Sequence, residues 1–234
     1  MIELSVTIMN SAFSMERVMN VERIIDKLGK ETIQKYWKKF EVIRDFEKKG
    51  AWYVAKKCWL FGACSNSTHH LVLQDDIDVS KNFVQGILKI IEACPQDILT
   101  LSTFPRKNFT GKTRWGLIEG VYGQGIVMPK EKLIEFLNWQ DKHILSNFPH
   151  DDSRISLFCK YIKYPIKVPF PNPIQHLDNH FKSTMGNKWN RPRISENYIG
   201  NNDPLTIDWS DDGVYEKSIN SFPPKKYYDY LIDL

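Results

Sequence analysis

The chain has 234 residues, of which 42% are hydrophobic and 26% charged, and its formal net charge is +4. These values are ordinary for a globular protein and predict one domain, or two tightly fused halves, with a sizeable core. The mild positive charge does not establish a nucleic-acid partner, and it does not oppose a polyanionic one. No apolar run of about 18 residues predicts a membrane span, and no signal-peptide pattern follows Met1.

Four cysteines are scattered along the chain without Cys-x-x-Cys spacing: Cys58, Cys64, Cys94 and Cys159. A zinc site is therefore not expected, and the simplest interpretation is free, mostly buried thiols. Free thiols are typical of a reducing compartment, so the composition favours a cytoplasmic protein.

The first half of the chain alternates between predicted strands and helices. Residues 4–9 predict a strand, and apolar residues at helical spacing then run from the N-cap Ser14 to a stop at Gly29. The alternation continues with a strand at 40–45, a helix at 51–65, a buried strand at 71–73, a helix from the N-cap Ser80 to about Ala93, and a strand at 97–104. This order is typical of a nucleotide-binding α/β unit. We expect an α/β fold with a single Rossmann-like mixed sheet flanked by helices.

The second half is less regular. Residues 105–114 form a loop with four cations and no acid, which is either a solvated hairpin or a contact surface for an anionic partner. The four cations are Arg106, Lys107, Lys112 and Arg114. Residues 116–128 resemble a strand interrupted by glycines, which indicates bulges or a close approach of the backbone to a ligand. Helices are predicted after Pro129 and near 149–154, an extended segment at 165–173, and an irregular tail over the last 60 residues.

Three carboxylates follow the buried strand at 71–73: Asp75, Asp76 and Asp78. Acids that gather at the carboxyl end of a strand repel one another and lose solvation unless a cation or hydrogen bonds compensate them. Oxygen ligands of this kind suit Mg²⁺ or Mn²⁺ carrying a phosphorylated substrate. The alternative is a solvated turn with one N-cap acid, although three acids exceed what a turn needs.

Asp76-Ile77-Asp78 is also the Asp-x-Asp pattern of nucleotide-sugar glycosyltransferases, and its position after an apolar strand makes the match more specific. With looser matches elsewhere, the chain resembles a glycosyltransferase of the GT-A fold over roughly residues 4–200. The looser matches are residues 5–10 with Arg17 downstream, the Asp45 stretch, residues 122–129, His150-Asp151-Asp152 and residues 173–176. The resemblance is closest to small bacterial and phage-encoded enzymes of the two-type and lipopolysaccharide-type families. It implies a single GT-A domain over residues 1–234, with a nucleotide-sugar-binding half to about residue 104 and an acceptor-binding half and tail beyond it.

The resemblance implies a metal site at the acid cluster. Asp76 and Asp78 would hold Mn²⁺ or Mg²⁺ across the donor diphosphate. His176 is either a further metal ligand or a structural histidine. His69 and His70 precede a buried strand and are expected to pack or cap there.

The same resemblance implies a donor site built from four residues. Asp75 would contact the ribose or the sugar, Asp45 would bind the base or ribose, and Asn10 would lie at the end of the first strand. Arg17 would approach a phosphate, unless it is a solvated cation on the face of its helix.

Asp151 and Asp152 match the later acid motif of inverting members of the family. A carboxylate there removes the acceptor proton as the acceptor oxygen attacks the anomeric carbon. Asp152 is preferred to Asp151 as the base, and one of the pair is expected to cap its helix. If neither is the base, a retaining mechanism is open.

The implied function is metal-dependent transfer of a hexose from a nucleotide sugar, with a UDP-sugar as the expected donor and inversion as the expected outcome. The acceptor stays open between lipopolysaccharide or another glycan, protein, a small molecule and a hydroxylated DNA base. A phage origin would favour the DNA base and would place the enzyme in the host cytoplasm.

Two other classes of function remain. A metal-dependent phosphoryl-transfer enzyme or nuclease also uses acids at strand ends, but no Asp-x-Asp-x-Thr or Glu-x-Lys motif lies beside this strand. A non-catalytic module that binds nucleic acid or glycan would use the basic loop and exposed aromatic residues, but it would not need the intact acid cluster.

Overall fold

A computed structural model of the chain describes residues 1–103, 112–177, 181, 194–195, 197–217 and 225–232. Its helices are α1 (Met15–Leu28), α2 (Lys30–Tyr36), α3 (Ala51–Ala63), α4 (Phe83–Ala93), α5 (Lys130–His143), α6 (Asp151–Tyr161) and the 3-10 helices η1 (Pro204–Thr206) and η2 (Lys225–Tyr230). Its strands are β1 (Leu4–Asn10), β2 (Lys39–Arg44), β3 (His69–Gln74), β4 (Ile77–Val79), β5 (Ile98–Thr100), β6 (Trp115–Ile118), β7 (Gly125–Pro129), β8 (Ile166–Pro169), β9 (Ile174–His176) and β10 (Tyr215–Lys217).

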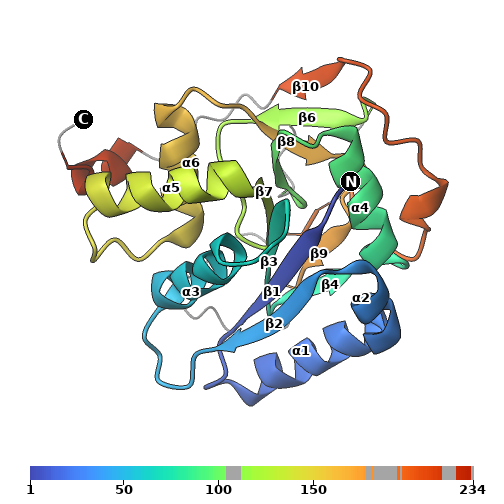
Figure 1. Cartoon of the computed structure of the whole chain (residues 1–234), viewed down its shortest axis with the longest axis horizontal. Coiled ribbons are helices and arrows are strands. Elements are labelled where there is room, and N and C mark those ends of the chain that lie inside the picture. The colour runs from blue at the N-terminus through green and yellow to red at the C-terminus, as the bar shows by residue number, and fades with distance from the viewer. Residues whose placement is uncertain (104–111, 178–180, 182–193, 196, 218–224, 233–234) are drawn as a thin grey trace.

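Within these described ranges, eight strands form one mixed sheet in the order β10-β6-β8-β5-β7-β3-β1-β2. β1 pairs in parallel with β2 and β3, whereas β7 is antiparallel to both β3 and β5. β4 and β9 form a separate antiparallel ribbon that continues from the carboxyl end of β3. The predicted α/β class, with a single Rossmann-like mixed sheet between helices, is confirmed (Figure 1).

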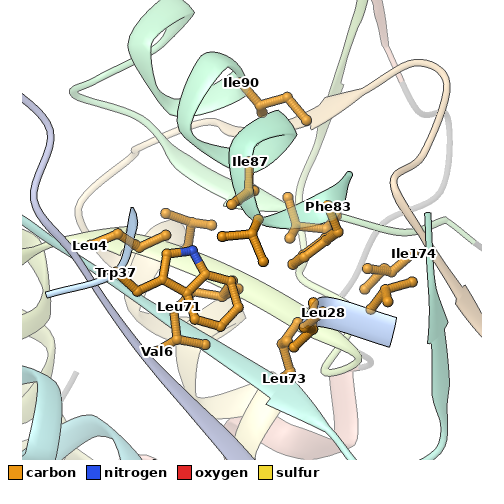
Figure 2. Packing of buried hydrophobic residues seen from close by; sticks show 14 of the residues in the cluster. Leu4, Val6, Leu28, Trp37, Leu71, Leu73, Phe83, Ile87, Ile90 and Ile174 are labelled. Atoms are coloured by element: carbon orange, nitrogen blue, oxygen red, sulfur yellow. The ribbon is translucent and has the colours of Figure 1, made fainter. Parts of the chain in front are cut away.

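The central strands direct their side chains into two cores, one on each face of the sheet. Leu71 and Leu73 pack in the core under α1, α2 and α4, and Val72 packs in the other core under α3, α5 and α6. Figure 2 shows the first core, in which Trp37 and Ile87 lie near the side chains of β1 and β3. Because both faces are covered, the central strands appear in the sequence as continuous apolar runs.

Helix α4 begins later than the sequence predicts. Its N-cap is Asn82, and the predicted N-cap Ser80 is wrong. Residues 77–79 form β4 instead of a turn, and the backbone N–H of Ser80 extends the ribbon by donating to the Pro173 oxygen at 2.9 Å. The helix therefore starts only after the ribbon ends.

Other boundaries differ less. Gly29 ends α1 with a φ of 77°, as predicted, but the short helix α2 follows it at once. The strand predicted at 97–104 is shorter in its described part: it forms β5, and the Leu101 N–H extends the pairing by donating to the Gly125 oxygen of β7 at 2.9 Å. The glycine-interrupted segment 116–128 divides into β6 and β7. In the part of the chain that the structure describes, no helix is long and apolar enough to cross a bilayer.

Candidate active site

The acid cluster lies where the central parallel strands end. β1 and β3 run side by side in register, so Asn10 and Gln74 end them at the same edge of the sheet. The chain then passes through Asp75 and Asp76 into β4, which pairs with β9 so that Ile77 faces His176. The ribbon thereby brings a histidine from the second half of the chain to the cluster.

Asp75 is the most firmly held of the three acids. Its Oδ2 accepts hydrogen bonds from Asn10 Nδ2 at 3.1 Å and from the Ser11 N–H at 2.6 Å, and its Oδ1 pairs with Arg17. Burial, and next to it the Asp76 carboxylate, raise the pKa of Asp75, while Arg17 opposes that rise. Helix α1 supports the same segment, because the side chain of its Asn20 donates to the backbone oxygen of Asp75 at 2.7 Å.

Arg17 joins two of the acids. One guanidinium nitrogen pairs with Asp75, and Nη2 lies 3.1 Å from Asp76 Oδ2. The arginine side chain is only 6% exposed, and the ring of Phe181 lies 5.6 Å from the guanidinium carbon. Burial disfavours its charge, but the Asp76 and Asp75 carboxylates together raise the pKa of Arg17, so it remains a cation. The alternative of a solvated helix-face cation is therefore wrong.

The predicted metal ligands are brought together only in part. Asp76 Oδ2 lies 3.3 Å from His176 Nε2, and both residues are buried. Asp78 is held elsewhere, with Oδ1 at 2.9 Å from Lys27 Nζ and Oδ2 accepting from the Tyr198 hydroxyl at 3.2 Å. Among the residues that the structure describes, no three His, Cys, Asp or Glu side chains are grouped closely enough to hold a metal ion.

The chemistry of the donor set nevertheless suits a divalent cation. A carboxylate and an imidazole that meet at one point are ligands that Mn²⁺ accepts. Asn10 adds an amide oxygen beside the cluster, which is buried and has no hydrogen-bond partner among the described residues. Asp76 and His176 can therefore form the nucleus of a metal site, and Asp78 can join it only if its contacts with Lys27 and Tyr198 open.

Asp45 lies next to the end of β1, but its carboxylate is used by its own loop. Its Oδ1 accepts from the backbone N–H groups of Glu47 and Lys49, both at 3.1 Å, and its Oδ2 accepts from that of Gly50 at 3.3 Å. The Asp45 N–H donates to the Asn10 oxygen at 2.8 Å. The predicted contact with the base or ribose stays a prediction, because the carboxylate orders the loop that leads into α3.

The two acids that open α6 differ in their surroundings. Asp152 Oδ1 accepts from the N–H of Ser153 at 2.6 Å and from its hydroxyl at 3.1 Å, so this oxygen is used inside the first turn of α6, whose N-cap is His150. For Asp151, burial and then the carboxylates of Asp152 and Asp76 raise the pKa to about 7. A carboxyl that titrates near neutrality is suited to general base catalysis.

Close packing requires a glycine at position 123, in the segment between β6 and β7. A Cβ at this position would lie 2.6 Å from Gln74 Nε2 and 3.6 Å from Asp152 Cβ. The glycine segment therefore passes between the end of β3 and the start of α6. The close approach at Gly123 is to protein side chains, and the predicted approach to a ligand stays a prediction.

Arg154 is a buried residue of α6 that the sequence analysis missed. Its guanidinium donates to the backbone oxygens of Leu145 at 3.0 Å and Phe148 at 2.5 Å, and lies 4.4 Å from the centre of the Trp52 ring. It thus fixes the loop that leads into the first turn of α6. One signal was available: Arg154 is the single charged residue in the stretch between Asp152 and Lys160.

His70 is structural, as expected. Its ring nitrogens lie 2.9 Å from Ser5 Oγ and 3.2 Å from Thr7 Oγ1. Burial lowers the pKa of His70 to about 3, so the ring is neutral. His69 contacts the Pro95 oxygen at 2.7 Å and likewise serves packing.

The basic loop is described only at its end, because Arg106 and Lys107 lie outside the described residues. Arg114 donates to the Phe170 oxygen at 2.9 Å, and its guanidinium lies 5.5 Å from the Trp209 ring. The Lys112 N–H donates to Glu216 at 2.9 Å. The end of this loop therefore contacts Glu216, an acid from the C-terminal part of the chain. The role of the loop toward an anionic acceptor stays a prediction.

No family model and no curated protein matches the chain. Among solved structures, A197 from STIV is similar at 11% identity and a TM-score of 0.47, over 78% of this chain and 87% of that one. A fragment of S. aureus TarS has 11% identity and a TM-score of 0.45, over 71% and 57%. A Drosophila β-1,4-galactosyltransferase 7 mutant, in complex with manganese, UDP-Gal and xylobiose, has 7% identity and a TM-score of 0.49, over 88% and 84%. Likeness at this level carries no information about activity or substrates.

Proposed function

We propose that the protein is a GT-A type glycosyltransferase that moves a sugar from a nucleotide sugar, with UDP as the expected nucleotide, to a hydroxyl acceptor. The observation that carries the proposal is the meeting of Asp75, Asp76, Arg17 and His176 where β1 and β3 end. The first turn of α6 lies beside the same end of β3, because the position of Gly123 adjoins both Gln74 and Asp152. Ligands of open α/β sheets bind outside the carboxyl ends of the strands. An acid cluster with a buried arginine at this edge suits a diphosphate accompanied by a divalent cation.

In this proposal Asp76 and His176 would hold Mn²⁺ or Mg²⁺, which when bound would neutralise the leaving diphosphate. Arg17 would contact a phosphate oxygen, because a guanidinium presents several donors in a fixed fork. Asp75 would orient Arg17 through its Oδ1, because Asn10 and Ser11 already donate to Oδ2 of Asp75.

Asp151 is the proposed base, in place of the Asp152 preferred from sequence. It would accept the acceptor's hydroxyl proton as the oxygen attacks the anomeric carbon and the bond to the diphosphate breaks. The reversal rests on the raised pKa of Asp151 and on the bonds of Asp152 to Ser153, which occupy Oδ1 of Asp152 within the first turn of α6. An attack from the side opposite the leaving group would invert the anomeric centre.

The first test is a thermal-shift screen of UDP-, GDP-, CMP- and dTDP-sugars with and without Mn²⁺. A nucleotide sugar that binds the folded state raises the melting temperature, because ligand at about 100 times its Kd adds about 2.7 kcal/mol of stability. We expect one class of donor to do so in the presence of Mn²⁺ and to be hydrolysed slowly without acceptor.

Asp76→Ala should abolish the metal-dependent part of the shift, and Lys38→Gln, which breaks only an exposed ion pair with Glu3, should keep it. If no nucleotide sugar binds wild-type protein with or without metal, the proposed function is wrong. Metal-dependent cleavage of a phosphodiester without sugar release would favour the phosphoryl-transfer class instead.

A further inference from the structure

We infer that Arg17 is a built-in counter-cation that competes with the divalent cation for Asp76, so that metal binding releases Arg17 toward the donor diphosphate. The inference rests on the proposed function and adds a sequence of events to it. Before the donor arrives, the arginine shields the acids, and when metal and donor enter together it changes partner.

The geometry allows Arg17 to leave one acid while keeping the other. Its two terminal nitrogens contact different carboxylates, one on Asp75 and one at 3.1 Å from Asp76. Asp75 has two further donors in Asn10 and Ser11, so this acid stays compensated in either position of the arginine. The guanidinium can therefore pivot on Asp75 and release only Asp76.

The backbone around the cluster does not have to move. Asn20 lies one turn after Arg17 on α1, and its side chain holds the backbone oxygens of Asp75 at 2.7 Å and Ile77 at 3.1 Å. These bonds anchor the acid-bearing segment independently of the arginine side chain. A change of partner at Asp76 can thus take place by side-chain rotation alone.

Electrostatics make the two cations exclusive. Two neighbouring carboxylates and one guanidinium leave a single net negative charge. Nη2 of Arg17 already lies 3.1 Å from Asp76 Oδ2, so a divalent ion bound to that oxygen would lie close to a second cation. Repulsion between the two cations then drives the arginine away from Asp76. A donor diphosphate supplies the negative charge that the displaced arginine needs, so metal and nucleotide should bind synergistically.

The experiment measures Mn²⁺ affinity directly, by the electron paramagnetic resonance signal of free Mn²⁺, with and without UDP. Arg17→Gln removes the competing cation and should bind Mn²⁺ roughly ten- to a hundredfold more tightly in the absence of UDP, the range expected from one lost charged hydrogen bond. In wild type, UDP should tighten Mn²⁺ binding strongly, and in the variant this gain should shrink.

The matched control is Arg44→Gln, the same substitution at an exposed arginine at the end of β2. Its guanidinium lies 3.7 Å from the carboxylate of Glu22, a residue of α1. It should change Mn²⁺ affinity by no more than about twofold, because exposed charges are screened. If Arg17→Gln does not fold, Arg17→Lys keeps the charge without the fork and should give an intermediate increase.

Unchanged or weaker Mn²⁺ binding in both Arg17 variants, with normal binding in wild type, would overturn the competition and leave the proposed transferase standing. An equal increase in Arg44→Gln would also overturn it, because the effect would then be general electrostatics. Failure of wild type to bind Mn²⁺ and UDP at all would instead overturn both the competition and the function beneath it.

Discussion

Asp151 and Asp152 open the same helix, yet the fold gives them different tasks. A helix N-terminus favours a charged carboxylate, and Asp152 follows this rule by accepting from the Ser153 N–H in the first turn. At Asp151, burial and two neighbouring acids outweigh the helix terminus and raise its pKa to about 7. A carboxyl whose pKa is raised by burial and by neighbouring acids is a candidate for acid–base catalysis.

The first prediction tests this division of roles. Asp151→Asn should lower turnover by a factor on the order of 10² to 10⁴, because it removes the general base, while donor affinity persists. Wild-type kcat/KM should rise with pH to a plateau with a midpoint near 7, as the base loses its proton. Initial rates of nucleoside diphosphate release measure both. If Asp152→Asn shows the loss and Asp151→Asn does not, the sequence-based preference was right.

The second prediction concerns stability. The folded-state pKa of Asp151, about 7, lies above the ordinary value of 3.8, so the folded protein holds a proton that the unfolded chain releases between those values. The stability gained from this proton is full below about pH 4 and is lost as the pH rises to 7. Asp151→Asn, which mimics the protonated form, should match wild type at pH 4 and exceed its stability at pH 8 by up to a few kcal/mol.

Urea denaturation at the two pH values measures this difference. The control is Asp26→Asn, at an exposed position of α1, where the difference from wild type should be similar at both. A stability gap for Asp151→Asn that does not widen between pH 4 and pH 8 would contradict the raised pKa.

At the scale of elements, the strands and helices that could be predicted from the sequence are those that bury a long, regular set of apolar side chains. β1 and β3 were predictable because their apolar runs are continuous. β4 was not, since it has three residues and its partner β9 comes only after α6. α2 buries only Ile33 of its seven residues, so it leaves no periodic signal.

The site follows the same logic. The approach of His176 to Asp76 was reachable through family resemblance, because both belong to quoted motifs. The burial of Arg17 was not, because a single sequence does not show which cation of an amphipathic helix faces inward. Arg154 was missed although it is the single charge in its stretch, because its partners are mainly backbone oxygens, which no residue type reveals.

Helix α3 supplies the third prediction, because Gly62 lets it approach β3. A Cβ there would lie 2.3 Å from His70 Cγ and 2.8 Å from His70 Cβ, and the hydrogen bonds to Ser5 and Thr7 restrain the ring. Gly62→Ala should therefore destabilise the protein by about 1–3 kcal/mol through overpacking, although alanine favours helices.

Chemical denaturation checks this value against Leu60→Ala, at a residue of the same helix that is 44% exposed. The control should change stability by no more than about 1 kcal/mol, since Leu60 is only partly packed. A neutral Gly62→Ala would show that α3 and β3 separate at little cost.

At the scale of the whole molecule, the C-terminal segment is bound to the sheet at the edge away from the acid cluster. Lys167 of β8 is buried and lies 3.0 Å from Asp97, which precedes β5, and 2.5 Å from Asp211. Nearby, Trp209 packs against Trp115 of β6 with ring centres 6.3 Å apart. β10 then adds to β6 in parallel, so residues 204–217 close one end of the sheet.

The last prediction separates this anchor from the active site. Lys167→Met leaves two acids without their shared cation and should cost about 3 kcal/mol, the order found when one partner of a buried ion pair is removed. Asp211→Asn should cost less, about 1 kcal/mol, because the Asp211 side chain is partly exposed. Asp211→Asn should nevertheless speed proteolysis within residues 200–214, since that segment loses a tether to β8.

Mn²⁺ and UDP affinities should persist in Asp211→Asn, because Asp97 and Asp75 lie at opposite ends of parallel strands. Unchanged proteolysis of Asp211→Asn would show that packing of Trp209 alone holds the segment, and lost UDP binding would show that the two edges are coupled through the sheet.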